Sequence, residues 1–416
     1  MTGFNEDIAR FRGNGPYLYI NDKTLIDAAS GTFNLPLGYT NKRLAEKLKQ
    51  QIDRCTHLSS AFTKPLSEQI LLKLRKHLPA GVDRMWLRDV SGSGAVEGAI
   101  RMAQKKTKRS GVISLFKSHH GQSLATARIS GNAFRLEEFT ANIDGSFKIP
   151  VPQSDLVEES KTQSAEINYF SQLEDFINFG SSGNIACMII EPILGNGGNI
   201  VLPAEFYRQV RKICSQYGIV VIADEVQTGF GRTGSFFAST GYAKELDPDI
   251  IVFAKGAGGI GIPIGGILMK QALDVLEPYE HSSTSGANPL SLVALHETIE
   301  IIEDEHLLLQ VQQNERYLKE GLLGLQQKYA SISGVRGVGY MFGFDVPSPE
   351  IARMVIDIAY SNGLVIRGSR YGKGRAIKVR PPLICTRDHL TEVIRKLDVT
   401  FAQLACELEM MDEVTA

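Results

Sequence analysis

The segment IVVIADEVQTGFGRTG, residues 219–234, decides how this chain is expected to fold. It begins with a β-branched, apolar run that ends just before Asp224. The preceding segment AEFYRQVRKICSQYG, residues 204–218, has apolar residues at helical spacing and ends at Gly218, a residue type that commonly closes helices. A helix followed directly by a buried strand is typical of a parallel sheet covered by helices.

The same alternation extends outward in both directions. Short apolar runs alternate with helical patterns between about residues 85 and 270, which predicts an α/β fold with a mostly parallel sheet flanked by helices. The clearest strands are expected at 185–190, 219–223, 250–253 and 265–269.

The pattern changes after about residue 285. Long helices are expected at 289–304 and 306–329, then short strands near 335–345 and 363–367, and a last helix from about Asp388. This pattern predicts a smaller α+β domain. We expect three parts: an N-terminal segment, 1–50, packed on the small domain; a large domain, 51–285; and the small domain, 286–416.

Composition favours small-molecule chemistry. The 416 residues are 43% hydrophobic, and 45 basic against 46 acidic residues give a net charge of −1, which offers no attraction to nucleic acid or to an anionic membrane. The five cysteines lack any C-x-x-C spacing, which argues against disulfides and a zinc site and favours a reducing cytoplasm. Residues 1–16 have no apolar targeting segment, and the polar stretch 153–167 is expected on the surface.

Asp224 and Lys255 are the first candidates for chemistry. Asp224 follows a buried strand, where open α/β sheets bind ligands, and a carboxylate there can keep a proton on the ring nitrogen of a pyridine cofactor. Taken alone, the aspartate is equally well explained by helix capping or an ion pair. Lys255 comes 31 residues later, about one strand-helix-strand crossover, so both side chains are expected at one edge of the sheet.

Lys255 stands in DPDIIVFAKGAGG, residues 247–259, between apolar and small residues. A lysine there is costly unless its amine is neutral or paired, and a neutral amine is what Schiff-base chemistry uses. A lone Lys-Gly would more simply be a surface lysine with a buried stem. The spacing between Lys255 and Asp224 removes the preference for a surface lysine.

A phosphate anchor is expected at the turn Ser91–Gly94, before a helix predicted to start near Ala95. Free backbone N–H groups and the positive end of a helix bind a phosphate monoester without basic side chains. Most Ser/Gly turns before helices are plain caps, so the turn gains weight only in combination with Asp224 and Lys255.

These motifs resemble the class III aminotransferases of ornithine and 4-aminobutyrate type, which belong to the fold-type-I pyridoxal-phosphate enzymes. The resemblance covers nearly the whole chain, through LGYTNKRLAEKLKQQ, SGSGAVEGAIRMAQ, SHHGQ, IIEPILGNGG, DEVQTGFGRTG, FAKGAGG, SSTSGANPL and RPPLICT. It implies a seven-stranded-type sheet, pyridoxal 5'-phosphate as cofactor, and a homodimer with shared active sites. No metal is implied.

The resemblance assigns roles residue by residue. Lys255 would carry the cofactor as a Schiff base and Asp224 would hold the pyridinium nitrogen, while Val226 would pack on the ring and Gln227 would lie near its phenolic oxygen. The remaining implied cofactor contacts are Gly92 and Ser93 at the phosphate, His119 on the other ring face, and Thr284 across the dimer interface. A core valine, an exposed glutamine, a cap, a loop histidine and a turn threonine are the plain alternatives.

Several positions depart from the family pattern and concern the substrate. Glu191 matches a carboxylate at the mouth of the site, or else is a strand-end acid paired with an arginine. Asn196 replaces a glutamate, and Lys378 replaces its arginine partner, with Arg380 two residues further on. Gly94 replaces another glutamate, which would widen the entrance.

The expected reaction is a ping-pong transamination between an amine donor and an oxo acceptor, with Lys255 moving the proton. The altered carboxylate clamp favours an ω-amino acid, a diamine or a biosynthetic intermediate as donor. A racemase, epimerase or aminomutase would use the same residues and is the main alternative; a non-catalytic family member is the third.

Overall fold

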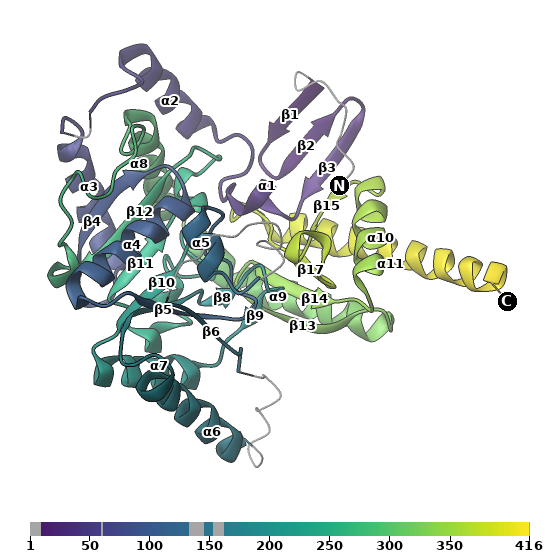
Figure 1. The fold of residues 1–416 in the computed structure, drawn as a ribbon. Helices are drawn as coiled ribbons and strands as arrows, with labels where there is room; N and C mark the ends of the chain where they lie inside the picture. Colours follow the sequence, from purple (N-terminus) through teal and green to yellow (C-terminus); the bar gives the residue numbers. More distant parts are fainter. Residues whose placement is uncertain (1–9, 60, 133–144, 153–161, 416) are drawn as a thin grey trace.

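A seven-stranded sheet forms the centre of the fold (Figure 1). The computed structural model describes residues 10–59, 61–132, 145–152 and 162–415. The sheet order is β4-β12-β11-β10-β7-β5-β6, and only the two pairings of β12 are antiparallel. The strands are β4 (Val82–Asp89), β5 (Gly111–Leu115), β6 (Ser146–Ile149), β7 (Ile185–Ile190), β10 (Val220–Asp224), β11 (Ile250–Phe253) and β12 (Gly265–Lys270). The prediction of a mostly parallel α/β sheet is therefore confirmed.

Helices cover both faces of this sheet, which is why its central strands are apolar throughout. Ile222 and Val252 pack in one cluster with residues of α4 (Gly92–Thr107), whereas Val221 and Ile251 pack in another that includes α7 (Ala204–Tyr217). Asp224 lies two residues after Ile222 and therefore points to the α4 side of the sheet. It is the last residue of β10, so the strand ends one residue later than the predicted range 219–223.

The start of α4 corrects one prediction. The helix begins at Gly92, not near Ala95, because Ser91 is its N-cap and its side chain accepts a hydrogen bond from Gly94 N at 3.2 Å. The glycines thus belong to the first turn of the helix, and their backbone N–H groups lie at its positive end. Helix α7 ends as predicted, with Gly218 in the left-handed conformation at φ 62°.

Two smaller sheets lie beside the large one (Figure 1). One has the order β13-β14-β17-β16, and the other joins the N-terminal strands to β15 in the order β1-β2-β3-β15. Their strands are β1 (Phe11–Asn14), β2 (Tyr17–Ile20), β3 (Lys23–Asp27), β13 (Ser333–Val338), β14 (Met341–Asp345), β15 (Leu364–Val365), β16 (Arg367–Gly368) and β17 (Ala376–Val379). A two-stranded ribbon is formed by β8 (Ile193–Leu194) and β9 (Ile200–Val201).

The remaining helices connect and cover these sheets. They are α1 (Ser30–Phe33), α2 (Lys42–Arg54), α3 (Lys64–Leu74), α5 (Leu124–Ile129), α6 (Thr162–Asp175), α8 (Pro289–Asp304), α9 (Leu307–Lys328), α10 (Pro349–Ser361) and α11 (Arg387–Thr415). The N-terminal strand β3 pairs in parallel with the C-terminal strand β15, whereas α2 packs on α8 beside the large sheet (Figure 1). The division into three parts stays a prediction, and residues 1–9 and 153–161 of the segments discussed above lie outside the described residues.

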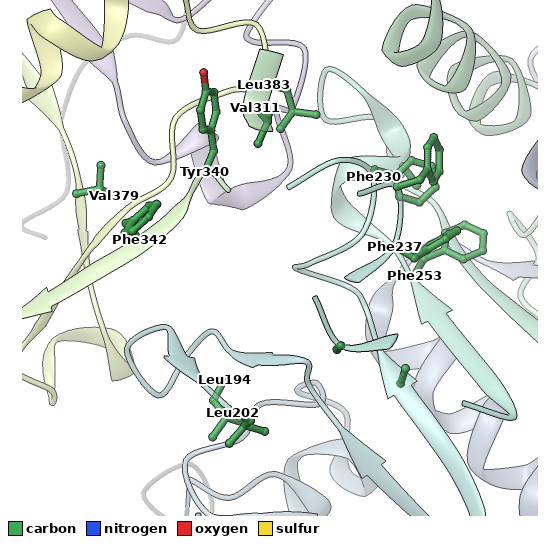
Figure 2. Close-up of a cluster of buried hydrophobic side chains, with 14 of the residues drawn as sticks. Leu194, Leu202, Phe230, Phe237, Phe253, Val311, Tyr340, Phe342, Val379 and Leu383 are labelled. Carbon is green, nitrogen blue, oxygen red and sulfur yellow. The ribbon is translucent and has the colours of Figure 1, made fainter. Parts of the chain in front are cut away.

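An aromatic cluster supports the end of β11. Figure 2 shows Phe230 beside Phe237 and Phe253, and the ring centroids of Phe230 and Phe253 are 5.5 Å apart. Phe236 completes the cluster, 5.0 Å from Phe230. All four side chains are buried. Close packing of large rings fixes the strand just before Lys255 and holds the DEVQTGFGRTG loop against it.

Candidate active site

A cavity of about 1100 Å³ opens where β10 and β11 end and α4 begins. Its inner part is lined by Gly92, Ser93, Asp224, Val226 and Lys255. Residues of α1, α10, β16 and β17 line the outer part. The fold therefore brings together Asp224 and Lys255, which the sequence predicted at one edge of the sheet, and the turn that the sequence suggested as a phosphate anchor.

Asp224 is held by a partner that sequence reasoning missed. Its Oδ2 lies 2.7 Å from Nδ1 of His120, and its Oδ1 accepts a hydrogen bond from Val226 N at 3.2 Å. His120 and Asp224 are both at most 3% exposed. A carboxylate fixed on two sides and still lining the cavity is oriented for a third polar group. The signal in the sequence was the doublet His119-His120, of which only the first was considered.

Lys255 occupies the turn that follows β11. Its φ of 38° lies in the left-handed region, which a lysine adopts only where the surrounding structure imposes it. Burial lowers the pKa of its amine, while the charges of Asp224 and Glu191 oppose that change. A lysine whose amine loses its proton more easily, at the wall of a cavity, is suited to attack a carbonyl carbon.

The turn Ser91–Gly94 lies close to the neighbouring strand ends. A Cβ atom at Gly92 would lie 3.0 Å from Val226 Cγ1, so the start of α4 approaches the ends of β10 and β11 closely. Ser93 Oγ accepts a hydrogen bond from Gln122 N at 3.0 Å. The first turn of α4 thus presents N–H groups to the cavity in the way that binds phosphate.

Gly94 has a structural reason of its own. A Cβ atom there would lie 1.9 Å from Asp89 Oδ1. Asp89 is in turn held by His281, whose Nε2 lies 2.6 Å from Oδ2. The space beside Gly94 is therefore filled by Asp89, and Gly94 is not among the residues that line the cavity.

Glu191 connects two loops at the back of the cavity. Its Oε1 accepts a hydrogen bond from His119 N at 2.6 Å and its Oε2 accepts one from Gly195 N at 3.0 Å. The side chain is 2% exposed, and burial raises its pKa to about 7, with His120 opposing and Asp224 adding to the rise. Glu191 therefore lies behind the wall, where it positions His119, which does line the cavity.

The raised pKa of Glu191 predicts a pH-dependent stability. A carboxyl whose pKa is raised in the folded state stabilises the fold fully at pH values below its usual pKa of 4.5. This stabilisation is lost as the pH rises through about 7. Glu191→Gln cannot lose a proton. We expect its free energy of unfolding, relative to wild type, to increase by about 3 kcal/mol across that interval. Urea unfolding of the cofactor-free proteins at several pH values measures this, and a pH-independent difference would contradict it.

Arg380 and Lys378 take different positions around the ring of Phe33. The guanidinium carbon of Arg380 lies 4.1 Å from the ring centroid and Lys378 Nζ lies 4.9 Å from it. Arg380 donates to Gln227 Oε1 at 2.5 Å, to Gly195 O at 3.0 Å and to Asn199 Oδ1. Arg380 thus holds Gln227 at the wall, while Lys378 itself lines the cavity.

Two further predicted residues are placed apart from each other. Asn196 lines the cavity, as Lys378 does. Thr284 is exposed and is not among the lining residues of its own chain's cavity.

Among the described residues, no group of three or more His, Cys, Asp or Glu side chains is arranged to hold a metal ion. No described helix is both long and apolar enough to cross a bilayer.

A lysine at the end of one parallel strand, a carboxylate at the end of the next, and a free helix N-terminus define a pyridoxal-phosphate enzyme of fold type I. Comparison with known proteins agrees: the family Aminotransferase class-III matches residues 5–401, and the chain belongs to this family. The structure of an amine transaminase from an uncultivated Pseudomonas species, in the PLP-bound form, is 26% identical, with a TM-score of 0.84 over 97% of this chain and 98% of the other.

Relatives of known activity include an aminotransferase and a racemase. The acetylornithine aminotransferase of Archaeoglobus fulgidus is 31% identical over 386 residues, which cover 92% of each chain. A leucine/methionine racemase of Thermococcus litoralis is 28% identical over 92% of this chain and 88% of its own length. The protein is thus a PLP-dependent transaminase, and the residues of its cavity fit that cofactor: a lysine amine, a buried carboxylate and a phosphate-binding helix end.

Proposed function

We propose that Lys255 binds the cofactor and moves the proton, that Asp224 holds the ring nitrogen, and that Gly92 and Ser93 hold the phosphate. The meeting of Lys255 and Asp224 with the start of α4 in one cavity carries this proposal. Val226 and His119 line the same cavity and are suited to pack on the two faces of a flat ring. Gln227, which accepts a hydrogen bond from Arg380, is proposed to contact the phenolic oxygen.

Pyridoxal phosphate supplies an electron-withdrawing ring that stabilises negative charge on the substrate carbon. The protein residues do the rest. Once its amine is free, Lys255 takes a proton from the substrate carbon and passes it to a carbon of the cofactor. The lowered pKa of the amine favours the unprotonated form that accepts this proton. Asp224 keeps a proton on the ring nitrogen, and His120 keeps Asp224 in place.

As donor we propose an amine remote from a carboxylate: an ω-amino acid, a diamine or a biosynthetic intermediate. The support is the replacement of the usual arginine by Lys378 and of its glutamate by Asn196, both of which line the cavity. The test is the visible absorbance of the holoenzyme after addition of α-amino acids, ω-amino acids, diamines and amino sugars, with detection of keto products. Bleaching with matching ketone identifies the donor; bleaching by α-amino acids alone would contradict the proposal.

Racemisation is a second candidate, favoured by the 28% identical racemase. It needs the same Lys255 and Asp224 but returns the proton to the same carbon. In D₂O a racemase incorporates deuterium at that carbon without releasing ketone, whereas a transaminase releases ketone in the first half-reaction. One incubation in D₂O therefore distinguishes racemisation from transamination.

We further propose a homodimer in which Thr284 contacts the cofactor phosphate in the partner's cavity, in a reducing cytoplasm. Thr284 is exposed and outside its own cavity, which leaves it available for this role, and all five cysteines are free. Thr284→Val should raise the dissociation constant of pyridoxal phosphate by about 10-fold, the value of one hydrogen bond to a charged group.

Titration of cofactor-free protein by fluorescence quenching tests this prediction. The neighbouring exposed Ser282→Ala is the matched control and should leave the dissociation constant as in wild type. Sedimentation velocity gives the state of association in the same buffer. A monomer that binds the cofactor as tightly as wild type would contradict the shared site.

A further inference from the structure

The outer wall of the cavity carries an excess of positive charge. Among the described residues that line the cavity, Asp224 and Asp357 are the acids, and Asp224 is already bonded to His120. The basic residues of the outer wall are Arg353, Arg367, Lys373 and Lys378. Such a wall attracts negatively charged substrates.

Two of these cations face each other directly. Arg367 of β16 and Lys378 of β17 are Cα partners in an antiparallel pair, so their side chains leave the same face of the sheet. Their Cβ atoms are then about 5 Å apart, a distance at which like charges destabilise a sheet. The pairing was invisible in the sequence, because the two residues are joined by an irregular loop whose register only the structure gives.

No carboxylate of the described chain contacts this pair directly. Asp27 interacts electrostatically with Arg367, and Glu191 with Lys378, but neither forms an ion pair with them. Instead, Arg367 Nε donates to Gly31 O at 2.8 Å and Lys378 lies over Phe33. Lys378 is only 4% exposed. Burial, then Arg380 and Arg367, lower the pKa of Lys378 well below its usual value, and the charge of Glu191 opposes this change. A buried amine in this setting gives up its proton readily, and a bound anion would restore its positive charge.

We infer that Arg367 and Lys378 together bind a dianionic group of the phosphate-monoester class, carried by the amino substrate at its end remote from the amine. The inference rests on the proposed transaminase function. One carboxylate would neutralise only one of the two cations, whereas a phosphate monoester carries a charge of about −1.5 to −2 and three acceptor oxygens. The arginine supplies a planar fork of donors and the lysine a point charge.

The position of the pair agrees with this assignment. The phosphate of the cofactor is accounted for at the opposite, inner end of the cavity by the first turn of α4. The volume of about 1100 Å³ is at the upper end for small-molecule sites, so it accommodates a substrate in addition to the cofactor. A second phosphate site therefore serves the substrate.

Three amines of similar length test the inference on the holoenzyme: 3-aminopropyl phosphate, 5-aminopentanoate and pentylamine. The measured quantity is the amine concentration that half-saturates the rate at which the bound cofactor loses its visible absorbance. We expect this concentration to be about 10-fold lower for the phosphate than for the carboxylate, and about 100-fold lower than for pentylamine. Inorganic phosphate, which has no amine, should compete with 3-aminopropyl phosphate without bleaching the cofactor.

The variants Arg367→Met and Lys378→Met should each reduce the ratio between pentylamine and 3-aminopropyl phosphate at least 10-fold. Arg375→Met is the matched control, because Arg375 is exposed, precedes the same strand and pairs with Asp345 at 3.8 Å outside the cavity. It should keep the wild-type ratio. Reaction of pentylamine without any preference for the phosphate overturns the inference and leaves the proposed function standing. No absorbance change with all three amines contradicts both.

Discussion

Lys255→Ala is expected to lower turnover at least about 10⁴-fold, to the background of the assay. The variant loses the amine that is proposed both to bind the cofactor covalently and to move the proton, and proton transfer alone accounts for a factor of about 10² to 10⁴. The fold should persist, because the aromatic cluster around Phe253 supports the same turn without the lysine side chain. The left-handed φ of 38° is no harder for alanine than for lysine.

Two measurements separate loss of chemistry from loss of structure. Reduction of the wild-type holoenzyme with borohydride, followed by peptide mapping, should attach the cofactor to the peptide that contains Lys255, and to none in the variant. Lys244→Ala, at an exposed lysine beyond the cavity, is the matched control and should behave as wild type. Full turnover by Lys255→Ala would remove this residue from the mechanism.

The elements that could be predicted from sequence are those whose signal is local. Strands β7 and β11 were predicted at their observed residues, because a strand buried on both faces is a continuous apolar run bounded by polar residues. The same locality explains the expected meeting of Asp224 and Lys255, since both follow parallel strands and parallel strands end at one edge. The end of α7 needed only Gly218.

The features that were missed depend on residues distant in the chain. The hydrogen bond between His120 and Asp224 joins residues 104 positions apart, and nothing in either sequence segment indicates that the two are in contact. The facing of Arg367 and Lys378 depends on strand register across a loop. Gly94 suggested a wider entrance, yet Asp89 fills the volume, held there by His281 from far along the chain. Side-chain orientation across long separations is set by packing, which spacing alone does not encode.

Asp224→Ala is expected to lower kcat by a factor of about 10³ or more while the protein stays folded and binds the cofactor. The variant lacks the carboxylate that is proposed to keep the ring nitrogen protonated, so the negative charge formed on the substrate carbon should be less well stabilised. The loss should fall on kcat more than on KM, because the interaction is stronger in the transition state. A variant with wild-type kcat would show that Asp224 is only a structural partner of His120.

His120 is expected to position Asp224, and this role can be measured apart from stability. His120→Asn removes the 2.7 Å contact with Asp224 and should lower kcat by about 10-fold, and the pH at which the visible absorbance of the bound cofactor changes should shift with it. His281→Asn is the matched control, since it breaks a partly buried histidine–aspartate contact of 2.6 Å outside the cavity. It should lower thermal stability and leave the absorbance profile unchanged. If both variants shift the profile alike, the effect of His120 is general destabilisation; if only His120→Asn does, the histidine acts on the cofactor through Asp224.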